Sequence, residues 1–397
     1  MHPIPRSLDD LSAGWIDAIL RQAGLLSTAR VRAAQVSAIG DQRGFMGHLY
    51  RLHLDLEGSD DATPKSVVVK LPTTKRAHRS FATMLGLYER EVRFYRELAP
   101  QLPIRTPIAH YAELDVAATE AELTKFARAD GMPKPFILPW ITLQMLKATL
   151  SPARRYALVL EDLGHAEIGD QLAGCDLADA ALVLSAAAQL HAHHWHERGL
   201  QGLSWIRPLD GSRLLVESAR RGCAEYMRLF PITEALEPHM RWFKQHGDST
   251  LEYLTQCPLT LNHGDLRLDN VFFLGTGSGR TTILADWQCV QRAPAAIEVA
   301  YFIVQSLPVE ASDADVVALL TQYHASLVGL GVDDYPLERL LRDYIQGLMY
   351  VLILQCSSAR SMNVKQDPEL RRLFDCIAER LVRRLAPIEP EQLKLPR

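Results

Sequence analysis

A short polar segment between two apolar runs carries the residue types that phosphoryl transfer requires. Residues 263–270 read HGDLRLDN, so a carboxylate, Asp265, is followed five positions later by the amide of Asn270. Asp286 comes sixteen positions after Asn270, directly behind an apolar run. One carboxylate can accept the proton of an attacking hydroxyl, while an amide and a second carboxylate offer the hard oxygen ligands that Mg²⁺ prefers. Asp265, Asn270 and Asp286 are therefore the candidate catalytic residues, with Asn270 and Asp286 as metal ligands.

These polar groups stand at the edges of short β-rich runs within a helical part of the chain. The predicted strands are residues 259–261, 271–274 and 282–285. A side chain at the end of a strand is held by a rigid element, which gives catalysis positional accuracy. Helical periodicity surrounds this island over residues 177–197, 214–245 and 335–386.

The first 160 residues have a different pattern, in which strands dominate. We predict an opening helix over 8–23, strands over 49–56, 66–71 and 156–160, and a charged helix over 81–98. Residues 119–150 give no clear pattern. The predicted fold class is α+β, a two-lobed protein-kinase-like fold with a small antiparallel β-rich lobe (1–160) and a larger, mainly helical lobe (161–397). Two lobes that meet at a hinge form a cleft, and clefts bind ligands.

Composition sets the broad class of the protein. Lys and Arg number 43 and Asp and Glu 47 among 397 residues, a net charge of −4, which argues against a nucleic acid partner. We find neither a secretory signal nor an apolar run of about 18 residues, so no membrane partner is expected. The six cysteines show no CxxC spacing, which is typical of reduced thiols. A cytoplasmic protein is predicted; its oligomeric state stays open.

The polar motifs resemble those of the aminoglycoside phosphotransferase/choline kinase superfamily, and most closely its ecdysteroid-kinase-like branch. The run from His263 to Asn270 matches the catalytic loop of that group, and the DWQ sequence at 286–288 matches its metal-binding motif. The resemblance covers about residues 35–305. It implies ATP and Mg²⁺ as cofactors.

Upstream motifs follow in the order that the resemblance requires. Glycines allow backbone N–H groups to approach phosphate, a lysine after a valine run can bridge the α- and β-phosphates, and a helical glutamate can hold that lysine. Backbone groups at the predicted hinge would contact the adenine edge. The nucleotide-binding residues implied are Gly40, Gly44, Gly47, Lys70, Glu91, Glu161 and Leu163.

Several of these signals also have ordinary structural interpretations. Spaced glycines occur in any hairpin turn, and His263 is more typical of a residue that shapes its loop by hydrogen bonding to the backbone. The superfamily usually has aspartate where this chain has Glu298, a longer carboxylate that would brace the catalytic segment. The histidine cluster 191–196 could hold a metal, but packing and surface roles are favoured.

The sequence therefore predicts an ATP- and Mg²⁺-dependent phosphotransferase that acts on a hydroxyl of a small molecule. The aromatic supply of the helical lobe favours a neutral, partly hydrophobic alcohol, although fold resemblance does not decide the acceptor. Two alternatives stay open: a non-catalytic, nucleotide-binding regulatory module of the same fold, and a histidine-based metalloprotein. The choice between ATP and GTP is also open.

Overall fold

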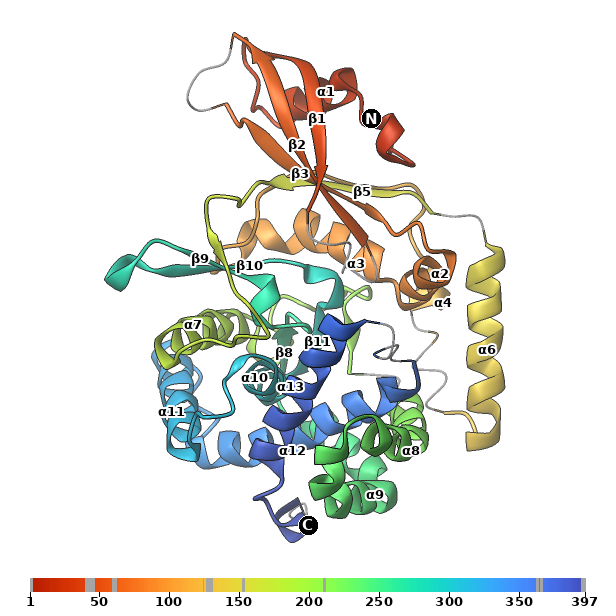
Figure 1. The fold of residues 1–397 in the computed structure, drawn as a ribbon, viewed down its shortest axis with the longest axis vertical. Coiled ribbons are helices and arrows are strands. Elements are labelled where there is room, and N and C mark those ends of the chain that lie inside the picture. Colours follow the sequence, from red (N-terminus) through yellow and green to blue (C-terminus); the bar gives the residue numbers. More distant parts are fainter. Residues whose placement is uncertain are drawn as a thin grey trace.

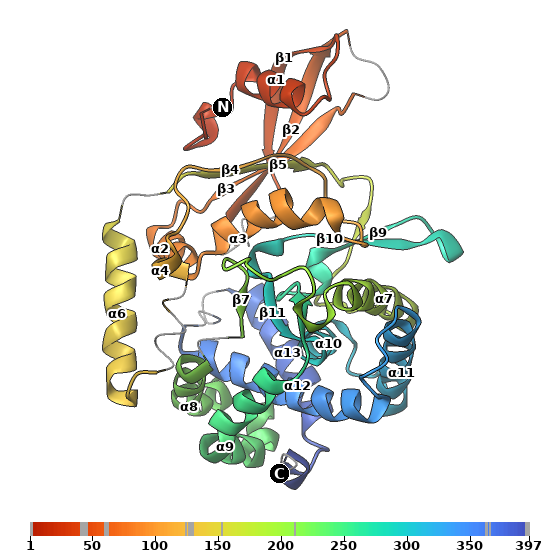
Figure 2. The ribbon, with the colours of Figure 1, turned by 180° about the vertical axis from the view of Figure 1, so that it is seen from behind.

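The computed structural model describes residues 3–39, 47–58, 63–123, 125, 131–151, 154–209, 212–361, 364 and 367–393. It has the predicted α+β class: an antiparallel sheet in the N-terminal part lies above a mostly helical remainder, as Figures 1 and 2 show from opposite sides. None of the described helices is long and apolar enough to cross a bilayer.

The N-terminal sheet places Lys70 near its centre. In space the strands follow the order β1-β2-β3-β5-β4, and every neighbouring pair is antiparallel. Lys70 lies opposite Leu49 on one side and Leu158 on the other. The elements are α1 (Ala13–Gln22), β1 (Arg30–Ala38), β2 (Gly47–Glu57), β3 (Ser66–Pro72), β4 (Ala109–Leu114) and β5 (Tyr156–Glu161). The three predicted strands are confirmed, and the predicted helix 8–23 is divided into a 3₁₀ turn at Leu8–Asp10 and α1.

The charged helix predicted over 81–98 is not continuous. It is divided into α2 (Arg76–Leu85), α3 (Leu87–Arg93) and a π-helical turn, η2 (Phe94–Leu98). Gly86 separates the first two with φ +70°, a left-handed conformation that glycine adopts without strain. The unassigned stretch 119–150 contains α4 (Glu120–Leu123) and α6 (Lys134–Leu150), which stands at the side of the molecule next to α2 (Figure 1).

The C-terminal part is built from helices around two small sheets. The helices are α7 (Leu177–His193), α8 (Ser212–Leu229), α9 (Glu237–Gln256), α10 (Ala295–Ser306), α11 (Asp313–Gly329), α12 (Leu337–Ser358) and α13 (Pro368–Leu385). One sheet joins β7 (Arg207–Pro208), β11 (Gln291–Pro294) and β8 (Leu259–Asn262); the other joins β10 (Thr281–Leu284), β9 (Val271–Leu274) and β6 (Glu167–Ile168). The three predicted strands exist, but β8 belongs to a different sheet from β9 and β10.

Two hydrophobic clusters form the core, and they do not coincide with the two predicted lobes. The smaller cluster packs α1 against one face of the sheet through residues such as Ile16, Leu52 and Val67. The larger cluster runs from α3 and η2, through Trp287, to the C-terminal helices. The division into residues 1–160 and 161–397 therefore stays a prediction.

Close packing of α8 against α12 leads to a stability prediction. Gly222 of α8 faces the backbone of α12, and a Cβ at this position would lie 1.8 Å from the Cys356 carbonyl oxygen. Because backbone atoms cannot move aside cheaply, we expect Gly222→Ala to lower the free energy of unfolding by about 3 kcal/mol. Urea unfolding followed by circular dichroism measures this change.

Gly329, at the end of α11, is the matched control. An added Cβ there meets no atom within 4 Å. We expect Gly329→Ala to leave stability unchanged or to raise it by up to about 1 kcal/mol, since alanine restricts the unfolded chain. Equal stability of the Gly222→Ala and Gly329→Ala proteins would contradict the described helix packing.

Candidate active site

The loop after β8 is fixed by backbone contacts on both sides. His263 Nε2–H donates to the Ala285 carbonyl over 2.8 Å, as expected for a histidine that shapes the loop. Gly264 follows with φ +82°, and a Cβ there would lie 2.1 Å from the Cys289 carbonyl oxygen. Only glycine fits where the loop passes the Cys289 backbone, because both the left-handed conformation and the close approach exclude a side chain. The loop thereby places Asp265 next to the segment that carries Asp286.

Three donors hold the carboxylate of Asp265. The Tyr301 hydroxyl donates to Oδ1 over 2.8 Å, and Oδ2 accepts from Asn270 Nδ2 at 3.1 Å. Arg267 Nε also lies 3.3 Å from Oδ2. Asn270 Nδ2 additionally donates to the Asp265 carbonyl over 2.8 Å, which closes the loop on itself. The first two predicted catalytic residues therefore touch, and the carboxylate has a fixed orientation.

Asp286 is joined to the predicted nucleotide-binding lysine. Lys70 Nζ lies 2.8 Å from Asp286 Oδ1 and 2.7 Å from Glu91 Oε1, and the Tyr156 hydroxyl donates to Glu91 Oε2 over 2.7 Å. Burial by itself would lower the pKa of Lys70, but the carboxylates of Asp286 and Glu91 outweigh burial and raise that pKa. Burial opposes ionisation of Asp286 as well, yet the charge of Lys70 holds the pKa of Asp286 below its usual value. Lys70 and Asp286 are therefore charged at neutral pH, whereas burial raises the pKa of Glu91 above its usual value despite the nearby charge of Lys70.

The β9–β10 hairpin brings these two groups of residues together. Asn270 precedes β9 and Asp286 follows shortly after β10, and the Ala285 N–H donates to the Asn270 carbonyl over 2.9 Å. Asp286 has φ +64°, a left-handed conformation that is strained for a residue other than glycine. Such strain persists only where the surroundings hold it, and it is common in functional sites.

The oxygen atoms at this position fit a Mg²⁺ ion. Asn270 directs its amide nitrogen to Asp265, so its Oδ1 is the atom left for a metal. Asp286 binds Lys70 through Oδ1, and among the described residues its Oδ2 has only a long 3.3 Å contact from Gln288 Nε2. Mg²⁺ needs few protein ligands because phosphates and water complete its shell. Within the described residues, no three His, Cys, Asp or Glu side chains are grouped as a metal site, which includes the described histidine cluster.

Of the remaining predicted nucleotide-binding residues, the structure describes Gly47, Glu161 and Leu163. Gly47 is adjacent to Lys70: a Cβ on it would lie 3.2 Å from Lys70 Cε. Gly40 and Gly44 lie outside the described residues. Glu161 uses its N–H for the Ile108 carbonyl, at 2.8 Å, and the Leu163 carbonyl accepts from the Ala166 N–H at 2.9 Å.

A buried carboxylate braces the catalytic loop from below. Glu298 of α10 accepts the Gly264 N–H through Oε1 at 2.7 Å, and its Oε2 lies 3.0 Å from His191 Nε2. His191 is fully buried on α7, and its Nδ1 lies 2.7 Å from the Tyr323 hydroxyl. The longer side chain of Glu298 thus reaches the loop, and the described position of His191 is one of packing and hydrogen bonding.

Removing this carboxylate's charge is expected to weaken the fold in a pH-dependent way. Burial alone would raise the pKa of Glu298, but the hydrogen bonds from His191 and Gly264 outweigh it, so the pKa lies below the ordinary 4.5. The folded state therefore gains stability above pH 4.5 and loses it as pH falls further. We expect Glu298→Gln to cost about 2 kcal/mol at pH 7 and less as pH falls from 5 to 3. Urea unfolding across that range measures the difference.

Glu338 supplies the control for this measurement. Its side chain is 87% exposed and pairs with Arg342 within one turn of α12. Exposed pairs of this kind contribute at most a few tenths of a kcal/mol, so Glu338→Gln should change stability little at any pH. A loss in Glu298→Gln that stays constant from pH 7 to pH 3 would argue against a depressed pKa.

Sequence reasoning missed the residues that position the carboxylates. Tyr301 belongs to the aromatic supply of the helical lobe, and it lies three positions after Glu298 on one helix, a spacing that places both toward the same loop. Tyr156 begins β5 and contacts Glu91 of α3, a pair that is distant in the sequence and that no local pattern indicates. Arg267 was not singled out; it contacts Asp265, Asp269 and Gln171.

A lysine of the antiparallel sheet pairs with a helical glutamate, and both face a loop of the helical part that carries an aspartate and an asparagine. This is the arrangement of the kinase-like phosphotransferases. The sequence places the chain more narrowly within this class. It belongs to the ecdysteroid kinase-like family, whose profile matches residues 41–195 and 209–331. The predicted superfamily and branch are confirmed.

Solved structures support the fold. The choline kinase from Cryptosporidium parvum Iowa II superposes with a TM-score of 0.51 at 11% identity, over 92% of this chain and 94% of that chain. The GDP complex of the aminoglycoside 2'-phosphotransferase-IIIa has a TM-score of 0.50 at 12% identity, over 92% and 96% of the two chains. Identities this low show the two-lobed kinase-like fold alone. No functionally curated protein matches the sequence.

Proposed function

We propose that this protein transfers the γ-phosphate of ATP, in the presence of Mg²⁺, to a hydroxyl group of a small molecule. The observation that supports this most is the contact of Lys70 with both Glu91 and Asp286. It places a buried cation beside the carboxylate of the proposed metal ligand, and buried charges arranged in this way are typical of a functional site.

Each described side chain has a role in this proposal. When bound, ATP supplies the phosphoryl group and Mg²⁺ neutralises its charge. Lys70 would bind the phosphates, and Asn270 Oδ1 and Asp286 Oδ2 would hold the metal. Asp265, with its orientation fixed by Tyr301 and Asn270, would accept the proton of the acceptor hydroxyl. Transfer then needs little beyond positioning and charge neutralisation.

At the hinge, the proposal assigns the adenine contact to Leu163. Its side chain is 5% exposed, and its N–H makes no hydrogen bond to a described residue. The Glu161 N–H is already bonded to Ile108, so only the carbonyl side of Glu161 is a candidate for the same contact. Gly40, Gly44 and Gly47 are proposed to cover the phosphates, as the resemblance implies.

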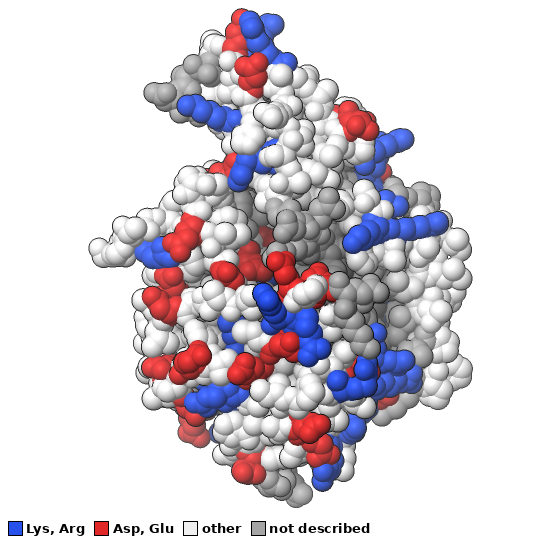
Figure 3. All heavy atoms as spheres, in the orientation of Figure 1, with Lys and Arg blue, Asp and Glu red and all other residues white. Residues whose placement is uncertain are grey.

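For the acceptor we propose a neutral, partly hydrophobic alcohol. The face seen in Figure 3 carries side chains of both signs, Lys/Arg as well as Asp/Glu. Tyr301 and Cys289 are near Asp265, and both are largely apolar groups. A strongly cationic acceptor would require a concentrated acidic wall instead.

The test is a pair of binding and turnover measurements on the full chain. We expect ATP with Mg²⁺ to raise the melting temperature more than ATP with EDTA, and a panel of neutral and cationic alcohols to include one that accelerates ADP release. Stabilisation by ATP and Mg²⁺ without turnover on any acceptor would favour the regulatory module. Absence of any stabilisation by nucleotide would refute the proposal.

A further inference from the structure

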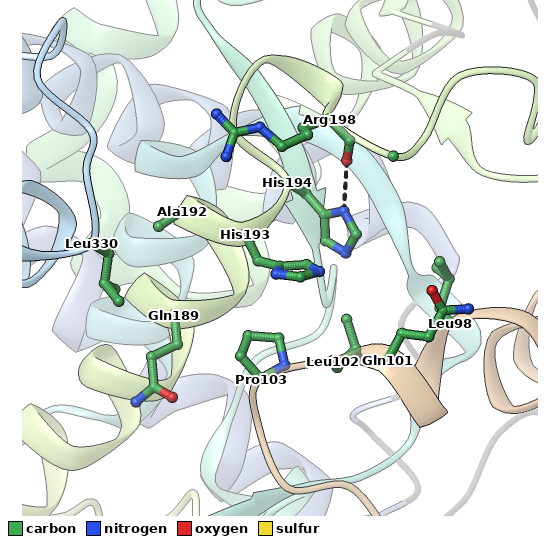
Figure 4. Close-up of a pocket in the computed structure, with 11 residues that line it drawn as sticks. Leu98, Gln101, Leu102, Pro103, Gln189, Ala192, His193, His194, Arg198 and Leu330 are labelled. Atoms are coloured by element: carbon green, nitrogen blue, oxygen red, sulfur yellow. Dashed lines mark hydrogen bonds between the residues drawn. The ribbon is translucent and has the colours of Figure 1, made fainter.

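A cavity of about 450 Å³ opens at the C-terminal end of α7, away from the residues that contact Asp265 and Lys70. One wall is α7, and the opposite wall is the segment 98–103 that follows η2 (Figure 4). Apolar and polar side chains both line it, and the polar ones are glutamine, histidine and Arg198. The residues that the argument uses are Leu98, Leu102, Gln189, Ala192, His193 and His194. A volume of this size suits a small organic molecule.

His194 presents an unsatisfied acceptor in this cavity. The residue is 4% exposed, and its Nδ1 lies 2.9 Å from the Arg198 carbonyl. Because a carbonyl oxygen only accepts, Nδ1 carries the hydrogen and Nε2 is left with a lone pair. Nε2 is buried and has no hydrogen-bond partner among the described residues. Figure 4 shows this edge of the ring directed toward the space between His193 and Leu102.

The turn behind α7 fixes the ring in this tautomer. His196 and Glu197 have φ values of +51° and +57°, a conformation that costs both residues free energy. Side-chain contacts hold the turn: His196 Nε2 lies 2.6 Å from Asp334 Oδ2, and Arg292 pairs with Glu197 at 2.8 Å. The strained turn delivers the Arg198 carbonyl to Nδ1, so the acceptor at Nε2 is a consequence of the fold. Burial also lowers the pKa of His194, which keeps the ring neutral.

We propose that this cavity is a second ligand site, which binds a small neutral molecule with an apolar body and one N–H or O–H group that donates to His194 Nε2. A buried acceptor without a partner costs free energy, and such a donor removes that cost. None of the described residues that line the cavity is acidic, so a cation would find no opposite charge there. The apolar body would pack on Leu98, Leu102 and Ala192.

The site is also connected to the catalytic groups through the chain. His191, which braces Glu298, lies three positions before His194 on α7. The opposite wall follows directly on α3 and η2, and α3 carries Glu91. A bound molecule would therefore contact the end of α7, the helix behind the catalytic loop, and the segment 98–103 that continues the chain after α3. The expected role is that of an effector site.

Indole and benzofuran form a matched pair of probes for the test. They share one shape, but indole donates an N–H where benzofuran has only a ring oxygen. Isothermal titration calorimetry on the full chain should show indole binding about tenfold more tightly than benzofuran, the difference that one hydrogen bond to a buried acceptor makes. Because the readout is binding, the result does not depend on phosphotransfer or on the proposed acceptor.

Three variants locate the binding. His194→Phe keeps a ring but removes the acceptor, and we expect it to bind indole and benzofuran equally. His193→Phe is the control, because this exposed neighbour also lines the cavity and its ring stands 4.7 Å from His194. It should keep the tenfold preference. Ala192→Trp fills the cavity without altering either histidine and should abolish binding of both probes.

Other results would overturn the proposal. If indole does not bind, or binds no better than benzofuran, Nε2 is satisfied by water alone. If Ala192→Trp still binds indole, the probe occupies another site. If His193→Phe rather than His194→Phe loses the preference, the donor contacts a different ring.

Discussion

Asp265→Asn is expected to lower kcat for the best acceptor by about 10²–10⁴-fold, the range that general-base groups supply. Asparagine keeps the size of the side chain and can still accept from Tyr301, but it cannot take the hydroxyl proton. Binding of ATP and Mg²⁺ should change little, because Asp265 contacts neither Lys70 nor Asp286 directly in the described structure. Steady-state kinetics and nucleotide-induced thermal shifts measure the two quantities separately.

Asp269 provides a control within the same loop. Its carboxylate is 43% exposed and pairs with Arg267, which also contacts Asp265. Asp269→Asn therefore removes a neighbouring charge without touching the proposed base, and we expect kcat within about threefold of wild type. Near wild-type turnover by the Asp265→Asn protein would show that Asp265 is not the base.

Asp286→Ala is expected to lower kcat by about 10³-fold and to abolish the additional stabilisation that Mg²⁺ gives to the ATP complex. The substitution removes a proposed metal ligand and leaves Lys70 with Glu91 alone. Electrostatic groups aimed at developing charge typically contribute 10²–10³-fold, and loss of the metal adds to this. Melting curves of the variant with ATP should be the same with Mg²⁺ and with EDTA.

The matched control is Asp248→Ala. Asp248 also pairs with a cation, Arg220, at 3.0 Å, but its side chain is 49% exposed on α9. Loss of an exposed pair has little effect on stability, so turnover and the Mg²⁺-dependent shift should both persist. A magnesium-dependent shift that survives in Asp286→Ala would place the metal elsewhere.

Local patterns were sufficient for the main strands and for the catalytic loop. The valine run that ends at Lys70 and the HGD sequence at 263–265 are short-range signals, and the structure puts both beside the same centre. The sequence patterns predicted turns less well than strands. Gly86 interrupts a helix whose apolar periodicity continues across it, because a left-handed residue changes the helix direction without changing the pattern.

Long-range contacts explain what the sequence did not reveal. Tyr156 and Glu91 are 65 positions apart, and their hydrogen bond depends on the arrangement of α3 under β5. α6 gave no clear pattern because apolar residues occur on all its sides: Ile137 is buried, whereas Phe136 and Leu150 are exposed. A helix without a separate polar face does not show the 3.6-residue alternation of apolar and polar residues from which helices are predicted.

The stacking of Trp287 on Phe94, with ring centroids 4.0 Å apart, packs η2 against the segment that carries Asp286. Together with the hydrogen bond from Arg90 to the Val290 carbonyl, it ties α3 to the segment that carries Asp286. Glu91 and Tyr88 of α3 also contact Tyr156 of the sheet, so Lys70 lies between two groups of contacts that both hold α3. Under the proposed function, nucleotide phosphates that bind Lys70 would therefore compete with Glu91 and Asp286 for this lysine.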